Sequence, residues 1–294
     1  MNKQKFSRIC SLSLGLLLLC VSPAYASEVS IPVASEEQQP HQEKILTELE
    51  QANIIYLGEN HDSLEDHQAQ LEIIQALYQK NPHLTIALEM FQRPFQGAID
   101  AYLAGEITEE ELIERSEYEQ RWGFPWEYYA PILRFAKEHN LSVLALNAPT
   151  EVTRKVARQG LESLTEEEKT YLPPLAEIRT DDAEYRQMLQ EIFQMHSHQG
   201  HGNSAGFENF FAAQVVWDET MAKTIAEFYQ TNPSQQIIVL AGQGHIVYGY
   251  GIPQRVARRI KQDSFTQISV LLGITEEEIT PENEEAIADY FWFQ

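Results

Sequence analysis

A short pattern, Gly-x-x-His, occurs twice in the 294-residue chain, each time directly after an apolar run. Gly58 and His61 form the first copy, and Gly242 and His245 form the second. Short runs rich in Ile, Val and Leu predict buried strands of a parallel sheet, and such sheets bind ligands beside the carboxyl ends of their strands. If these two strands are near neighbours, the two histidines converge on one site.

Other polar side chains follow apolar runs at the same expected edge. Glu59 lies inside the first copy of the pattern, Glu89 and Asn147 each follow a further apolar run, and Arg93 lies four residues after Glu89. A buried carboxylate is costly without a partner, so the two glutamates require a metal ion, an arginine or a histidine.

Two histidines with one or two carboxylates, and no sulfur ligand, suit a divalent ion such as Zn²⁺ or Fe²⁺. Glu59, His61 and His245 are therefore candidate metal ligands. The alternative is that these side chains cap turns and satisfy one another's hydrogen bonds.

The glycine-rich stretch near residue 200 contains the spacing H-x-H-x-x-H, formed by His196, His198 and His201. It could supply an imidazole to a metal or to haem iron, and His196 is the favoured candidate because it follows an apolar segment. Glycine-rich loops also carry surface histidines that have no function.

Two tyrosines are further candidates, because tyrosine is an established ligand of haem iron. Tyr129 ends the aromatic segment 122–129, and Tyr250 lies between two glycines shortly after His245. Flat apolar pockets with a few polar groups suit a porphyrin-sized ligand. The alternative for the aromatic segment is ordinary core packing.

Several common catalytic motifs are missing from the sequence. It has no G-x-S-x-G, H-E-x-x-H, G-x-x-x-x-G-K-[ST] or G-x-G-x-x-G pattern, which disfavours α/β-type serine hydrolases, zincins and nucleotide-dependent enzymes.

The elements that position these residues alternate along the chain, which predicts a three-layer α/β/α fold with a mostly parallel central sheet. Residues 44–294 are expected to form one domain, after a flexible lead-in at 27–43. The predicted strands cover residues 54–57, 85–88, 142–146 and 237–241, and the predicted helices cover residues 64–79, 131–140 and 210–229. Residues 150–208 are expected to form a helical insertion that acts as a lid, and residues 289–293 an edge strand.

Net charge and cysteine content exclude several functions. The formal charge is −23, which repels nucleic acids and anionic lipid surfaces. Both cysteines fall within residues 1–26, whose basic start, short apolar run and Ala24-Tyr25-Ala26 end predict a signal peptide. Cleavage near Ala26 would leave an exported, acidic protein without cysteine, and hence without disulfides or thiolate ligands.

Lipid attachment at Cys20 is the competing interpretation of the same segment, although Leu19 replaces the small residue that a lipoprotein signal requires. It would add a surface anchor, and membrane association is expected only in that case.

An ordered set of motifs across about residues 44–261 resembles the ChaN-like haem-binding uptake family, which belongs with the Tiki and erythromycin-esterase-like proteins. The motifs that carry the resemblance are Ile-Ile-Tyr-Leu-Gly-Glu-Asn-His at 54–61, Ala-Leu-Glu-Met-Phe at 87–91, Arg-Trp at 121–122, Trp-Glu-Tyr-Tyr at 126–129, Leu-Ala-Leu-Asn-Ala-Pro at 144–149 and Ala-Gly-Gln-Gly-His at 241–245.

The resemblance implies haem binding coupled to iron uptake, and a homodimer formed through bound haem. The leading hypothesis is an exported haem-binding protein. Its candidate cofactor-binding residues are His61, His196, His245, Tyr250, Tyr129 and Arg93.

Relatives in the wider superfamily imply the alternative, a metal-dependent peptidase or esterase. Its catalytic residues would be Glu59, His61, Glu89 and His245. A third possibility is a pocket that has lost its chemistry and serves as an interaction surface.

Overall fold

A computed structural model describes residues 39–197, 204–275, 279 and 287–293 of the chain. The predicted signal peptide at 1–26, most of the lead-in at 27–43, and His198 and His201 lie outside these residues.

Six strands form one sheet in which every neighbouring pair is parallel. The strands are β1 (Ile54–Glu59), β2 (Leu84–Gln92), β3 (Ser142–Asn147), β4 (Gln236–Gly242), β5 (Gln267–Leu272) and β6 (Tyr290–Trp292), in the spatial order β3-β2-β4-β1-β5-β6. The four strands predicted from apolar runs are confirmed, and β6 is the predicted strand at the sheet edge. Strand β5 was not predicted from the sequence.

Helices connect the strands. They are α2 (Gln39–Leu49), α3 (Leu64–Lys80), α4 (Gln96–Leu103), α5 (Glu109–Arg115), α6 (Tyr118–Arg121), α7 (Trp126–Glu138), α8 (Thr150–Gln159), α9 (Glu166–Lys169), α10 (Ala183–Ser197), α11 (Ser204–Thr231) and α12 (Ile252–Ala257), with short 3₁₀ turns η1 (Arg93–Phe95), η2 (Leu161–Ser163), η3 (Leu175–Glu177), η4 (Gln243–His245) and η5 (Val247–Gly249). None of the helices in the described part of the chain combines the length and apolarity needed to cross a membrane.

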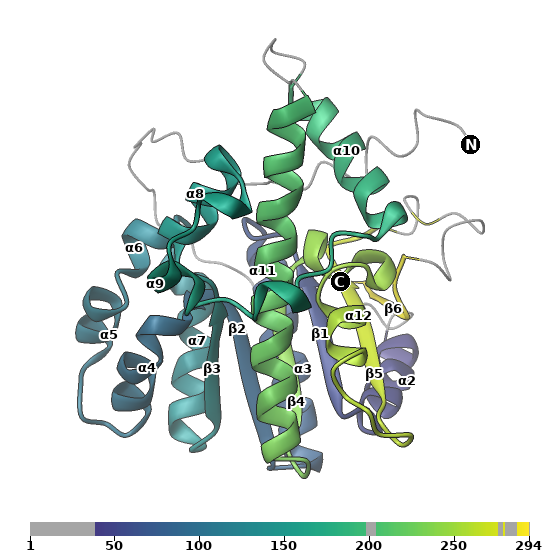
Figure 1. Ribbon diagram of the computed structural model, residues 1–294. Helices are drawn as coiled ribbons and strands as arrows, with labels where there is room; N and C mark the ends of the chain where they lie inside the picture. Colours follow the sequence, from purple (N-terminus) through teal and green to yellow (C-terminus); the bar gives the residue numbers. More distant parts are fainter. Residues whose placement is uncertain (1–38, 198–203, 276–278, 280–286, 294) are drawn as a thin grey trace, which may run out of the picture.

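The helices cover both faces of the sheet, which confirms the three-layer prediction. Alternate residues along a strand enter different cores because successive side chains point to opposite faces. In β4, for example, Ile237 and Val239 pack with α8, α10, α11 and α12, whereas Ile238 and Leu240 pack with α2, α3, α4 and α7. Figure 1 shows α11 and α12 crossing the near face of the sheet.

After β3, at one edge of the sheet, the chain crosses back toward the centre and forms β4 between β2 and β1. Such a reversal brings the carboxyl ends of β2, β4 and β1 together at a topological switch point, where ligands of open α/β sheets bind. Figure 1 shows α10 and the first half of α11 rising above this end of the sheet. The lid role of residues 150–208 stays a prediction.

Side chains bond to the backbone of both outermost strands. On β3, Gln96 donates to the carbonyl of Val143 and accepts from the amide of Ala145, each at 2.7 Å. At β6, Gln42 donates to the carbonyl of Phe293 at 2.8 Å, and Nε2 of His41 lies 3.2 Å from the carbonyl oxygen of Phe291.

Candidate functional site

The two predicted histidines converge at the strand ends, around Glu89 and Gly242. His61 follows β1, and His245 ends the turn that follows β4. A Cβ atom placed on Gly242 would lie 2.8 Å from Nε2 of His61, so only glycine lets the imidazole approach β4 this closely. The charge of Glu89 acts on both histidines.

Glu59 is fully surrounded by hydrogen-bond donors. Its Oε1 lies 2.8 Å from Nδ1 of His61 and accepts from the hydroxyl of Tyr129 at 2.5 Å. Its Oε2 accepts from Nε2 of Gln70 at 2.5 Å. Tyr129 is fully buried, and burial with the nearby charge of Glu59 raises its pKa well above the ordinary value. The Tyr129 hydroxyl therefore donates to Glu59 and is not available to a ligand from solvent.

His61 lies under aromatic side chains of the segment 122–129. Its ring centroid is 4.8 Å from that of Trp122 and 5.1 Å from that of Phe124, and its side chain is 16% exposed. Burial alone would lower the pKa of His61, but the hydrogen bond to Glu59 and the charge of Glu89 together raise it.

His245 lies between two buried carboxylates. Its Nδ1 is 2.7 Å from Oδ1 of Asp218, and its Nε2 is 3.4 Å from Oε1 of Glu89. The other oxygen of Asp218 accepts from the hydroxyl of Tyr185 at 2.6 Å, and the other oxygen of Glu89 accepts from the amide of Gly242 at 2.8 Å.

Opposite charges hold the His245 group together. Burial alone would lower the pKa of His245, but the charge of Glu89 and the hydrogen bond to Asp218 raise it to about 10. Burial alone would raise the pKa of Glu89, but the charge of His245 outweighs it and lowers the value to about 2. At neutral pH His245 is therefore a buried imidazolium. We call Glu59, His61, Glu89, Asp218 and His245 together the histidine array.

The histidine array offers no support for the predicted metal site. Among the described residues, no group of three or more His, Cys, Asp or Glu side chains is arranged to hold a metal ion. The physical reason is that Glu59 and Asp218 already receive hydrogen bonds at both oxygens, and a protonated His245 has no lone pair for a metal. The metal ion on which the hydrolase alternative relied is therefore without support among the described residues.

Tyr250 lies in a tight turn that begins at His245. We call residues 245–251 the tyrosine turn. Tyr248 has a left-handed backbone conformation, with φ at 58°, that is uncommon for a residue with a side chain. The rings of Tyr248 and Tyr250 are stacked, with centroids 5.3 Å apart and an interplanar angle of 22°, and both are partly exposed. The hydroxyl of Tyr250 donates to Glu184 at 3.3 Å.

The remaining predicted residues do not join the histidine array. Arg93 begins η1 and is partly exposed, and it makes no ion pair with any residue that the structure describes. Glu89 is paired with His245 instead of with Arg93. Asn147 donates to the backbone carbonyl of Glu89 at 3.1 Å. His196 lies in the last turn of α10, and its side chain is outside the described part of the structure.

Sequence reasoning missed Asp218 and Tyr185. Asp218 is completely buried on α11, one helical turn from the buried Val215 and Met221. A carboxylate among apolar residues at helical spacing is the signal that could have found it, because a buried acid requires a partner. Tyr185 had no comparable signal, since its partner is 33 residues away.

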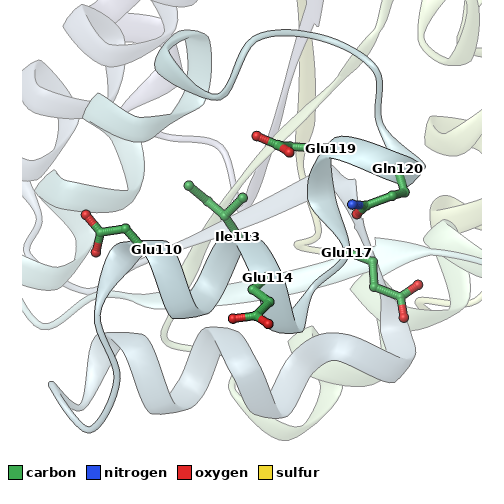
Figure 2. Close-up of a pocket in the computed structure, with 6 residues that line it drawn as sticks. All are labelled: Glu110, Ile113, Glu114, Glu117, Glu119 and Gln120. Carbon is green, nitrogen blue, oxygen red and sulfur yellow. The ribbon is translucent and has the colours of Figure 1, made fainter.

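One hollow on the described surface lies apart from the predicted site residues. It measures about 410 Å³, lies along α5 and α6, and is lined by Glu110, Ile113, Glu114, Glu117, Glu119 and Gln120. Figure 2 shows these mainly acidic side chains on the two helices. The hollow contains none of the predicted site residues.

Three comparisons place the chain among known proteins. Protein RETICULATA-RELATED 5, chloroplastic, of Arabidopsis thaliana is 26% identical over 292 residues, which is 91% of this chain but only 37% of that protein. A solved structure described as cofacial heme binding to ChaN of Campylobacter jejuni has 21% identity and a TM-score of 0.64, and the match covers 85% of this chain and 90% of that one. A mutant of the erythromycin esterase EreC in its open conformation has 17% identity and a TM-score of 0.46, with 79% and 72% of the two chains covered.

The ChaN structure shares the fold of this protein, which agrees with the three-layer architecture described above. The family described as haem-binding uptake, Tiki superfamily, ChaN matches residues 45–256, a range that contains both the histidine array and the tyrosine turn. This chain therefore belongs to the ChaN family of haem-binding uptake proteins.

Proposed function

We propose that this protein binds haem at the tyrosine turn, with the hydroxyl oxygen of Tyr250 as the iron ligand. The observation that carries the proposal is the availability of that oxygen. It lies on a partly exposed side chain and donates a 3.3 Å hydrogen bond to the exposed carboxylate of Glu184. The family to which the chain belongs supports haem as the ligand.

The histidine array is a poor alternative for iron ligation. His245 is buried and protonated, so neither of its nitrogens has a free lone pair. His61 has Nδ1 on Glu59, and its Nε2 faces the backbone of β4 at Gly242, where a Cβ atom would lie only 2.8 Å away. Tyr129 is buried with its hydroxyl on Glu59.

Haem would supply an iron that a tyrosine oxygen can ligate, and Tyr250 would provide that oxygen. Burial and the charge of Glu184 raise the pKa of Tyr250, so the free side chain keeps its proton. Glu184 already accepts this hydrogen and is placed to receive it when the oxygen becomes a ligand. The stacked ring of Tyr248 holds the ring of Tyr250 in place.

Titration of the purified protein with hemin tests the proposal. We expect a shifted Soret band near one equivalent, and a Tyr250→Phe variant that lowers hemin affinity about ten-fold or more and loses the visible bands of a tyrosine-ligated ferric haem. Tyr171→Phe is the matched control, because Tyr171 is an exposed tyrosine on another part of the surface. Equal spectra for Tyr250→Phe and wild type would assign the ligand elsewhere.

We further propose that the protein is exported and serves haem or iron handling outside the cytoplasm. The pattern of residues 1–26 supports export, and the family supports a role in uptake. The mass of the mature N-terminus after expression with its natural leader tests cleavage near Ala26. A retained leader, or a lipid on Cys20, would contradict the soluble exported form.

A homodimer formed through bound haem also stays a prediction. Sedimentation of the protein with and without one equivalent of hemin tests it. A single monomeric species under both conditions would exclude the dimer.

A further inference from the structure

The two ends of the tyrosine turn are linked, one directly and one through Arg255, to two neighbouring residues of α11. At the first end, His245 is bonded to Asp218, at 2.7 Å. At the second end, the turn is held by Arg255, whose counter-ion is Glu219. Asp218 and Glu219 are both completely buried.

Arg255 holds the second end through the backbone. Its Nη1 donates to the carbonyl of Gly251 at 2.8 Å and also to the carbonyl of Tyr250. One nitrogen of a side chain that is only 2% exposed thus binds two successive carbonyls at the end of the turn. A Cβ atom on Gly251 would lie 2.1 Å from the carbonyl oxygen of His245, so the two ends of the turn are packed directly against each other.

The charge of Arg255 is neutralised inside the protein. Its Nε lies 3.4 Å from Oε1 of Glu219, and the other oxygen of Glu219 accepts from Arg258 at 2.5 Å and from Arg259 at 2.7 Å. Burial of a charged pair costs several kcal/mol of desolvation, and such pairs are weak contributors to stability. We therefore infer that Arg255, which donates to two backbone carbonyls, fixes the geometry of the turn more than it stabilises the fold.

Tyr185 of α10 joins the two anchors. Its ring lies 5.0 Å from the guanidinium carbon of Arg255, and its hydroxyl donates to Asp218 at 2.6 Å. The ring of Tyr185 is also 6.3 Å from that of Tyr250. Tyr185 therefore contacts the side chains that hold the two ends of the turn, Asp218 at the first end and Arg255 at the second.

We propose that Arg255 is the positioning residue of the tyrosine turn: it fixes the backbone of Tyr250 and Gly251, and so the direction in which the Tyr250 hydroxyl is presented. The identity of the ligand that this hydroxyl binds rests on the proposed function. The positioning itself is a property of the free protein.

Hydrogen exchange of the full-length, haem-free protein tests the positioning. Arg255→Lys keeps the charge beside Glu219 but loses the planar group that reaches two carbonyls. We expect amide exchange in residues 246–251 to become about ten-fold faster or more, with little change elsewhere. Arg258→Lys is the matched control, because Arg258 shares Glu219 but bonds to the carbonyl of Glu177 instead of to the turn. Equal effects of the two variants on this segment would overturn the proposal.

Hemin titration of the same variants gives the second measurement. Arg255→Lys should weaken hemin binding about ten-fold and alter the visible bands of the complex, whereas Arg258→Lys should leave both unchanged. If wild type binds no hemin, the proposed function fails, and hydrogen exchange still decides the positioning.

Should Arg255→Lys not fold, wild-type protein labelled with ¹⁵N-arginine replaces it. We expect the Nη1 hydrogens of Arg255 to be protected from exchange, because two backbone carbonyls accept from that nitrogen. Exchange as fast as that of the exposed Arg115 would overturn the proposal.

Discussion

The histidine array and the tyrosine turn share His245 but differ in what their other polar atoms are free to do. In the array, His245 has both nitrogens beside carboxylates and Glu59 has three hydrogen-bond donors. In the turn, Tyr250 is partly exposed and its hydroxyl contacts an exposed carboxylate.

The difference shows that residue types locate a site but do not say which atoms are available. Histidines and glutamates that follow parallel strands indicate a binding site. Both the histidine array and the tyrosine turn lie at that edge of the sheet. The array, however, is an internal ionic structure, and the proposed iron ligand is a tyrosine in the following turn. Variants should therefore affect stability in the first region and ligand binding in the second.

Asp218→Ala should have the largest effect on stability. It leaves the imidazolium of His245 and the hydroxyl of Tyr185 without their shared acceptor, and loss of one partner of a buried ion pair costs about 3–5 kcal/mol of unfolding free energy. Chemical denaturation measures the change. Asp263→Ala, at an exposed position, is the control and should cost less than about 0.5 kcal/mol. Equal losses of unfolding free energy for the two variants would mean that the ion pair of Asp218 does not stabilise the fold.

The pH dependence of stability should follow the Glu89–His245 pair. The contribution of Glu89 is complete above its ordinary pKa of 4.5 and is lost as pH falls toward its folded-state pKa of about 2. That of His245 is complete below its ordinary pKa of 6.5 and is lost as pH rises toward about 10.

These two groups therefore predict greatest stability between about pH 4.5 and pH 6.5, with a loss on the order of 3 kcal/mol on the acid side. Denaturation at a series of pH values measures the profile. Glu89→Gln should flatten both arms, and an unchanged profile in that variant would assign the dependence to other groups.

Gly242→Ala should have a smaller effect on the same region. Its added methyl group would lie 2.8 Å from Nε2 of His61, so the imidazole must move away from β4, at a cost of about 1–3 kcal/mol. Gly244→Ala is the matched control two residues away, because its Cβ atom would meet nothing within 4 Å. Thermal unfolding of both variants compares them, and equal melting temperatures would contradict the close approach of His61 to β4.

Tyr250→Phe should have the smallest effect on stability, less than about 0.5 kcal/mol, because it removes one hydroxyl from a partly exposed side chain. The same variant should have the largest effect on hemin binding. His245→Gln should show the reverse, with reduced stability and an unchanged pattern of iron ligation. A hemin spectrum that responds to His245→Gln and not to Tyr250→Phe would reverse the comparison.

Much of the fold was predictable because buried parallel strands leave a plain pattern. Four apolar runs predicted β1 to β4. Strand β5 was missed because its first half is only partly buried and carries polar residues such as Gln267 and Ser269. The end of β2 was also longer than predicted, since a register shift lets it continue to Gln92.

The candidate site was only partly predictable. The convergence of His61, Glu89 and His245 followed from the strand ends, but their partners Asp218, Tyr185 and Gln70 come from helices, whose faces depend on tertiary packing. The availability of the Tyr250 hydroxyl likewise depends on a turn held by Arg255, which is buried against partners far along the chain.

The side chains that bond to the two outermost strands have a consequence for how copies of this protein can associate. Gln96 already uses a donor and an acceptor of β3, and Gln42 and His41 contact carbonyl groups of the segment that ends the sheet at β6. A second chain could add a strand at β3 only by displacing Gln96, which protects that border against edge-to-edge aggregation. Any dimer of this protein is therefore expected to form through side chains or a bound ligand, not through a continuous intermolecular sheet.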